Sequence, residues 1–141
     1  MPQRPNQKRI ALVAHDQKKA EMIAWSKHHI KRLEPHLLWA TGTTGNQVTE
    51  ATGLKINLLK SGPLGGDQQL GAMIVEGEID ILFFFTDPLS SMPHDVDVKA
   101  LLRISTLQQT VIACNRATAD YVILSDLFRR PSEVSALSSV M

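Results

Sequence analysis

Short apolar runs alternate along this chain with segments of helical periodicity, and this alternation constrains the fold more than any other feature. Residues 10–14 (IALVA), 79–85 (IDILFFF) and 110–114 (TVIAC) are compact and largely apolar, which is typical of strands buried on both faces. The remaining predicted elements are strands over residues 36–40 and 56–59 and helices over 17–33, 46–52, 67–76, 95–105 and 117–124. Because strands that alternate with helices form βαβ units, the sequence predicts an α/β fold, a doubly wound, mainly parallel sheet with helices on both faces.

Length and composition limit the class of protein. The 141 residues correspond to about one domain. Fifteen basic and 14 acidic residues give a net charge of +1, which argues against a nucleic-acid-binding surface or an acidic interaction tail. The single cysteine, Cys114, excludes an intrachain disulfide framework and is predicted to be a small buried hydrophobic residue rather than a nucleophile.

Three segments are expected along the chain. Residues 1–8 are polar and contain two prolines, which predicts a disordered N-terminal arm, and residues 9–128 are predicted to form a single α/β domain. Residues 129–141 form a serine-rich C-terminal tail whose weak pattern leaves its order open. The longest apolar run, residues 81–85, is far shorter than the ~18 residues of a membrane span, and the N-terminus lacks a signal-peptide core. We therefore expect no membrane association and a cytoplasmic location.

Polar and glycine-rich segments follow the predicted strands. In a parallel sheet the carboxyl ends of the strands share one edge, and ligands bind beyond that edge. The segments predicted to meet there are His15 and Asp16, residues 41–45, residues 61–67, residues 86–97 and Asn115.

Two of these segments contain closely spaced glycines. Residues 41–45, Thr41-Gly42-Thr43-Thr44-Gly45, lie between a strand and a helix, where backbone N–H groups and threonine hydroxyls can hold an anion. A plain turn with a threonine N-cap explains the same pattern, and spacing alone leaves both interpretations open. Residues 61–69, SGPLGGDQQ, form a rigid loop before a helix that Asp67 opens, so Asp67 is either an ordinary helix cap or a general base facing a cavity.

Histidines and carboxylates lie on the same predicted edge. His94, Asp95 and Asp97 open a helix; the carboxylates can serve as caps, and His94 is either solvated or a donor to an oxyanion or a phosphate. His15 and Lys19 share a helix face if their helix begins early, and the alternative is a solvated, capped first turn.

A second group of histidines precedes the second predicted strand. The basic run at residues 27–32 contains His28 and His29 and is predicted to be a solvated face. No third ligand is apparent, so no metal site is expected. Asp120 is interpreted as part of a helix surface.

Four segments together resemble the methylglyoxal synthase family. They are IALVAHD at 10–16, ATGTTGN at 40–46, LKSGPLGGDQQ at 59–69 and PHDVDVKALLR at 93–103. The resemblance extends over about residues 8–125. It implies a flavodoxin-like fold and a carbon–oxygen lyase that converts dihydroxyacetone phosphate to methylglyoxal and inorganic phosphate, a bypass of glycolysis. It also implies that no cofactor is used, that inorganic phosphate is an inhibitor, and that the assembly is a homohexamer.

The resemblance also implies roles for individual residues. Asp67 matches the catalytic base that removes a C3 proton to give an enediolate, and His94 matches the group that binds the carbonyl and hydroxyl oxygens. Asp16 and Asp97 match active-site carboxylates whose separate roles stay open. The positions matching substrate-binding residues are His15, Lys19, Thr41, Gly42, Thr43, Thr44, Ser61, Gly62 and His94, with Lys19 and residues 41–44 nearest the phosphate. Many family members carry a phosphate-binding arginine near the C-terminus, but no arginine follows Arg130 here, so no arginine is assigned to the phosphate.

Three alternative functions were compared with the lyase. A regulatory module resembling the effector-binding domain of carbamoyl-phosphate synthetase would need the anion site but no poised carboxylate, so Asp67, His94 and Asp97 favour an enzyme. An isomerase would share the first proton transfer and would differ only in how the C–O bond of the phosphate ester is held. Dinucleotide binding is disfavoured because the glycine fingerprint is missing.

Overall fold

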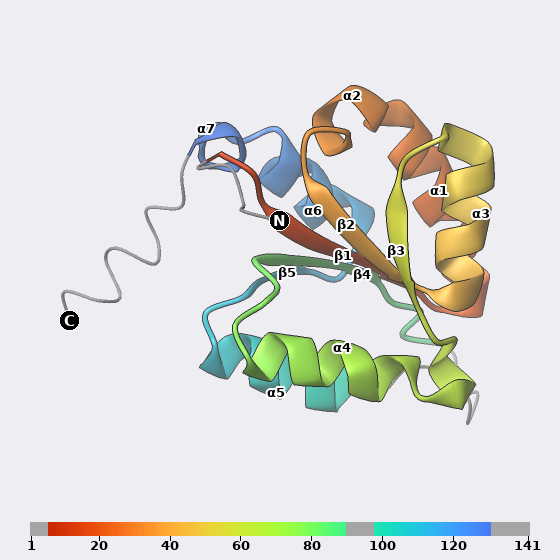
Figure 1. Cartoon of the computed structure of the whole chain (residues 1–141), viewed down its shortest axis with the longest axis vertical. Helices are drawn as coiled ribbons and strands as arrows, with labels where there is room; N and C mark the ends of the chain where they lie inside the picture. Colours follow the sequence, from red (N-terminus) through yellow and green to blue (C-terminus); the bar gives the residue numbers. More distant parts are fainter. Residues whose placement is uncertain (1–5, 90–97, 131–141) are drawn as a thin grey trace, which may run out of the picture.

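The computed structural model describes residues 6–89 and 98–130, and its centre is a five-stranded, all-parallel sheet (Figure 1). The strand order is β3-β2-β1-β4-β5. The strands are β1 Arg9–Ala14, β2 Leu37–Thr41, β3 Ile56–Leu59, β4 Ile81–Phe85 and β5 Val111–Ala113. The helices are η1 Asp16–Lys18, α1 Lys19–His28, α2 Ile30–Leu33, α3 Gly42–Thr52, η2 Gly62–Leu64, α4 Gly66–Val75, α5 Val98–Leu107, α6 Arg116–Ile123 and α7 Asp126–Arg129. The predicted doubly wound α/β fold is confirmed.

The neighbouring inner strands β1 and β4 are buried on both faces, as their continuous apolar sequences predicted. Successive side chains of a strand point to opposite faces, so β1 contributes Ile10 and Leu12 to one core and Ala11 and Val13 to the other. Helices α4 and α5 cover one face, and α1, α3 and α6 cover the other (Figure 1). Both cores depend on phenylalanines of β4, which are fully buried.

Several element boundaries differ from the sequence-based expectations. The segment predicted as a turn at residues 41–45 is instead the first turn of α3, which begins at Gly42. The helix predicted over residues 17–33 is interrupted at His29, which has φ −111° and lies between α1 and α2. Helix α7 was not predicted at all. No helix among the described residues is long and apolar enough to cross a membrane.

The strand order positions the ligand-binding edge of the sheet. The chain first builds β1, β2 and β3 in one direction and then adds β4 and β5 on the other side of β1. The winding direction therefore changes between β1 and β4, and in open α/β sheets ligands bind at the carboxyl ends of the strands beside such a change.

Candidate functional site at the carboxyl end of the sheet

The N-terminus of α3 lies directly against the loop that follows β3. The backbone N–H of Gly42 donates to the carbonyl oxygen of Lys60 at 3.4 Å. A Cβ atom on Gly42 would lie 3.2 Å from the Ser61 nitrogen and 3.3 Å from the Leu59 oxygen. Glycine at position 42 therefore lets two predicted binding segments, 41–44 and 61–62, meet.

The loop after β3 is held by its own backbone. Gly65 adopts φ +101°, which favours glycine, and is the N-cap of α4. The N–H of Gly66 donates to the carbonyl oxygen of Ser61 at 2.9 Å, and the Lys60 N–H donates to the side-chain oxygen of Gln69 at 2.7 Å. These bonds fix the start of α4, the residue Asp67 included, relative to the Lys60–Ser61 peptide.

Asp67 is not the helix cap that one interpretation predicted. Gly65 occupies that position, and Asp67 follows in the first turn of α4 with a half-buried side chain. Within residues 6–89 and 98–130 its carboxylate has no hydrogen-bond or ion-pair partner. The helix does not use this carboxylate for capping, so it is left for another role.

The threonines of the first turn of α3 do not cap the helix either. Thr41 is the N-cap and is buried, but its side chain makes no capping hydrogen bond. The hydroxyl of Thr44 is buried and has no hydrogen-bond partner in the described part of the chain. Thr43 is exposed. The first N–H groups of any helix lack intrahelical acceptors and carry partial positive charge, so this turn is equipped to hold an anion.

His15 connects the ends of β1 and β4. Its Nδ1 atom accepts a 2.8 Å hydrogen bond from the backbone N–H of Asp87. The imidazole is buried and packs edge-on against Phe84, with ring centroids 5.1 Å apart. An accepting Nδ1 means that a neutral ring carries its proton on Nε2, so this hydrogen bond defines the tautomer of a neutral His15.

Lys19 is held by a neighbouring carboxylate. The ammonium group of Lys19 forms an ion pair with exposed Asp16, three residues earlier. Helix α1 begins only at Lys19, so His15 and Lys19 do not share a face of one helix, and Lys19 pairs with Asp16 across η1.

Two predicted catalytic residues, His94 and Asp97, lie outside the described residues, and their roles stay predictions.

The two C-terminal arginines, Arg129 and Arg130, lie at the other end of the sheet. Arg129 belongs to α7, and the carbonyl oxygen of Arg130 accepts a hydrogen bond from Lys8, just before β1 begins. Neither arginine is at the carboxyl end of the sheet within this chain.

The basic run at residues 27–32 was predicted to be a solvated face, and this prediction is wrong for His29. His29 is only 3% exposed. Its Nε2 lies 3.4 Å from Oδ1 of Asp120, which also accepts a 2.8 Å bond from Trp25 Nε1. Burial lowers the pKa of His29, so the ring is neutral and the nearby Arg32 guanidinium can donate to its Nδ1. Asp120 thus joins α6 to α1 and is not simply a surface residue.

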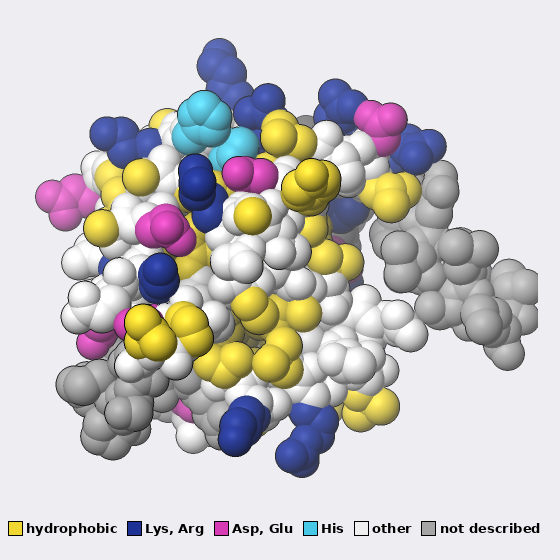
Figure 2. Space-filling view, turned by 180° about the vertical axis from the view of Figure 1, so that it is seen from behind, with side chains coloured by type: hydrophobic (Ala, Val, Ile, Leu, Met, Phe, Trp, Pro, Cys, Tyr) yellow, Lys and Arg dark blue, Asp and Glu magenta, His cyan; other side chains and the backbone are white. Residues whose placement is uncertain are grey.

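Figure 2 shows histidine side chains between basic and acidic side chains on the side of the molecule opposite to the view of Figure 1. Within residues 6–89 and 98–130, no group of three or more His, Cys, Asp or Glu side chains is placed to share one metal ion.

Burial raises the pKa of the Cys114 thiol, which disfavours the nucleophilic thiolate.

Fold and site together define a class, the doubly wound α/β domains that bind an anionic ligand at the carboxyl ends of their strands. Comparison with known proteins is more specific. The family model described as "MGS-like domain" matches residues 21–113. The chain belongs to the methylglyoxal synthase family, whose members are enzymes of the lyase class.

Relatives and a solved structure agree with this membership. A methylglyoxal synthase of Erwinia tasmaniensis is 55% identical over 128 residues, which cover 91% of this chain and 84% of the relative. One from Saccharophagus degradans is 56% identical over 129 residues, 92% of this chain and 84% of the relative. The crystal structure of methylglyoxal synthase from Elizabethkingia anophelis NUHP1 superposes with a TM-score of 0.86 at 48% identity, covering 89% of this chain and 83% of that chain.

Proposed function

We propose that this chain converts dihydroxyacetone phosphate to methylglyoxal and inorganic phosphate at the carboxyl end of its sheet. One observation supports this most directly: backbone contacts link the N-terminus of α3, through Gly42 and Ser61, to the start of α4, where Asp67 lies. The proposed anion site and the Asp67 carboxylate therefore belong to adjoining segments. The reaction requires such a pair, because it needs one group for the phosphate and another for the carbon acid.

The phosphate is bound by the first turn of α3 and the neighbouring loop. The N–H groups of Thr43 and Thr44 and the threonine hydroxyls supply hydrogen-bond donors, as do Ser61 and Gly62. Gly42, whose own N–H donates to Lys60, contributes by letting the two segments approach each other. Lys19 contributes a positive charge. The unpartnered, buried hydroxyl of Thr44 supports this assignment, because a buried polar atom without a partner is costly unless a ligand completes it.

The reaction begins with proton transfer. The Asp67 carboxylate takes a proton from C3 of the substrate, next to the carbonyl, and the electron pair forms an enediolate. His94 and the Nε2–H of His15 donate to the substrate oxygens, where negative charge develops. Asp16 and Asp97 are proposed as further active-site carboxylates, with Asp16 holding Lys19.

Elimination follows from the enediolate. The π electrons of its C2–C3 double bond form a C1–C2 double bond as the C1–O bond to phosphate breaks, and the C3 hydroxyl loses its proton to the departing phosphate and becomes the aldehyde. The resulting enolate takes back a proton from Asp67 at C1, its methylene carbon, which gives methylglyoxal and inorganic phosphate. The breaking bond has to stand out of the enediolate plane to overlap with the π system. A phosphate held in that orientation distinguishes the lyase from an isomerase, which would keep the bond in plane.

The proposal also includes the cofactor requirement, the location, the assembly and the inhibition of the enzyme. The enzyme would need no cofactor, since proton transfer and elimination use only side chains and backbone donors. We further propose a cytoplasmic location, a homohexameric assembly and inhibition by inorganic phosphate, which is a product and competes for the first turn of α3.

The direct test incubates the purified protein with dihydroxyacetone phosphate and measures methylglyoxal and free phosphate together. Equal amounts of both products support the lyase. Glyceraldehyde 3-phosphate would indicate an isomerase, and the absence of any product would indicate a regulatory module.

A variant pair tests the assigned base. Asp67→Asn keeps the size of the side chain but removes the basic oxygen pair, so we expect turnover to fall by at least about a hundredfold with an unchanged melting temperature. Glu76→Gln is the matched control, because Glu76 is exposed at the other end of α4. Near-normal turnover in Asp67→Asn would remove Asp67 as the base.

A further inference from the structure

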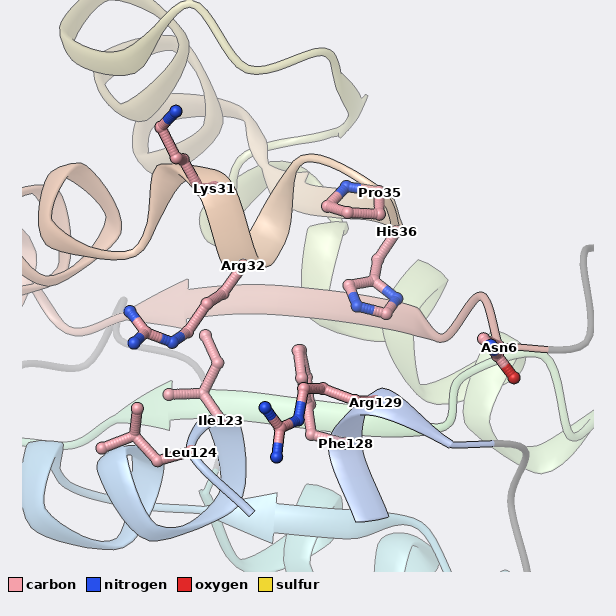
Figure 3. Close-up of a pocket in the computed structure, with 9 residues that line it drawn as sticks. All are labelled: Asn6, Lys31, Arg32, Pro35, His36, Ile123, Leu124, Phe128 and Arg129. Atoms are coloured by element: carbon pink, nitrogen blue, oxygen red, sulfur yellow. The ribbon is translucent and has the colours of Figure 1, made fainter. Parts of the chain in front are cut away.

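A second cavity lies at the opposite end of the sheet from the proposed active site. Its volume is about 440 Å³, and it opens between the segment joining α2 to β2 and helices α6 and α7 (Figure 3). It lies at the amino ends of the strands, since His36 immediately precedes β2. Its lining includes Lys31, Arg32, His36, Ile123, Phe128 and Arg129.

The inner wall of this cavity is apolar and rigid. Ile123 is 1% exposed and Phe128 is 3% exposed, and both belong to the core between the sheet and α6. The Phe128 ring packs against the His36 imidazole with centroids 4.6 Å apart. Leu124 is 54% exposed and extends the apolar surface toward the opening. A planar or branched apolar group therefore has a preformed surface to contact.

The rim of the cavity is cationic. Lys31, Arg32 and Arg129 all line it, and no acidic side chain from residues 6–89 or 98–130 does. Arg32 has one nitrogen near His29, and Arg129 has one nitrogen paired with Asp126. A guanidinium carries five N–H donors, so each arginine has further donors for a ligand.

His36 adds a neutral imidazole to the lining of the cavity. Its Nδ1 accepts a 2.8 Å hydrogen bond from the backbone N–H of Lys8, so a neutral ring carries its proton on Nε2. Burial, together with the nearby Lys8, lowers the His36 pKa to about 4. Figure 3 shows the imidazole and the Arg32 and Arg129 side chains arranged around the same space.

We propose that this cavity binds a small organic anion, whose carboxylate or phosphoryl group contacts Arg32 and Arg129 and whose apolar body lies against Ile123 and Phe128. Apolar walls with a few convergent polar groups are the usual form of a small-molecule site. Arginine recognises carboxylates and phosphoryl groups alike through paired N–H donors. The site is separate from the proposed active site and does not depend on the activity proposed for it.

The test uses phenylphosphonate and benzoate as probes, with benzyl alcohol as the uncharged counterpart, in calorimetric titrations of the full-length protein. We expect both anions to bind and benzyl alcohol to bind at least about tenfold more weakly; the stronger anion identifies the preferred head group. Arg32→Gln and Arg129→Gln should each weaken anion binding about fivefold or more. Arg103→Gln, which changes an exposed arginine of α5, should leave it unchanged.

Two further variants separate this cavity from the active site. Leu124→Glu places a carboxylate at the cavity mouth and should weaken anion binding by repulsion, whereas Lys19→Gln should not affect the cavity. Thermal melting of each variant verifies that it is folded. The proposal is overturned if neither anion binds, if benzyl alcohol binds as tightly as the anions, or if binding is lost in Lys19→Gln but retained in Arg32→Gln and Arg129→Gln.

Discussion

Gly66 is the position where adding one methyl group should be most damaging, and the structure sets the size of the effect. A Cβ atom there would lie 1.9 Å from the carbonyl oxygen of Lys60 and 2.9 Å from its carbonyl carbon. Real Cβ atoms stay beyond 3.0 Å, so the Lys60 peptide or the start of α4 would have to move by about 1 Å. The obstacle is backbone, already held by hydrogen bonds from Gly66 to Ser61 and from Lys60 to Gln69, so it cannot rotate away.

Both stability and activity should respond in Gly66→Ala. Overpacking of this kind costs about 1–3 kcal/mol, and the helix-forming advantage of alanine offsets less than about 1 kcal/mol of that cost. We therefore expect the free energy of unfolding to fall by roughly 2 kcal/mol. Asp67 is the next residue, and a displacement of about 1 Å in a catalytic group can lower the rate about a hundredfold.

The assay compares urea unfolding curves and kcat/KM for Gly66→Ala and Gly71→Ala. Gly71 lies in the same helix, but a Cβ there would be 3.4 Å from the Ile104 side chain, close to ordinary van der Waals contact. Gly71→Ala should thus keep its activity and be as stable as the parent or up to about 1 kcal/mol more stable. Wild-type stability and activity in Gly66→Ala, or equal losses in both variants, would refute the steric argument.

Three other predictions concern stability and are checked by urea unfolding. Asp120→Ala leaves a buried indole N–H and a buried imidazole without their acceptor, so it should lower the free energy of unfolding by about 1–3 kcal/mol. The control Asp126→Ala removes an exposed ion pair and should lower it by less than about 1 kcal/mol. Equal losses of stability in the two variants would contradict the role given to Asp120. Asp80→Asn weakens the two-point ion pair with Arg9, whose N···O distances are 3.0 and 3.2 Å, and should cost about 1–2 kcal/mol; a smaller loss at 1 M salt would support a charge effect. The pKa of His36 is lowered from 6.5 to about 4, so the unfolded chain binds this proton more readily than the folded chain does. The free energy of unfolding should therefore fall by up to roughly 3 kcal/mol as the pH drops from 6.5 to 4. His36→Asn should flatten this pH dependence, and an unchanged pH dependence in the variant would refute the assignment to His36.

The predicted strands show how far local pattern extends. Apolar runs such as residues 10–14 and 81–85 favoured strands in a sheet covered on both faces, and both runs are buried in β1 and β4. The polar residues that end them were expected at one edge of the sheet for the same reason, and His15 and Asp87 do meet there.

Two of the sequence-based predictions, those for residues 41–45 and for His29, were wrong for the same reason. Residues 41–45 read as a turn because glycine and threonine have weak helix propensity, yet they begin α3, where Gly45 packs closely on Ala40 and Leu58. His29 was expected to be solvated because its neighbours are basic, and it is buried because Asp120, 91 residues later, lies beside it. In both cases distant residues override the local preference.

The sequence by itself determined the five strands, most of the helices, the class of fold and the family, because hydrophobic periodicity and motif spacing are properties of neighbouring residues. Only the tertiary structure decided that Gly42 touches Ser61, that Gly66 has no room for a side chain, and that Nδ1 of His15 accepts a hydrogen bond from the backbone of Asp87. It also decided that Arg32 and Arg129 share a cavity at the far end of the sheet. Except for the crowding at Gly66, which arises within one loop, these contacts join segments that are distant in the sequence, and they exist only once the strand order has brought those segments together.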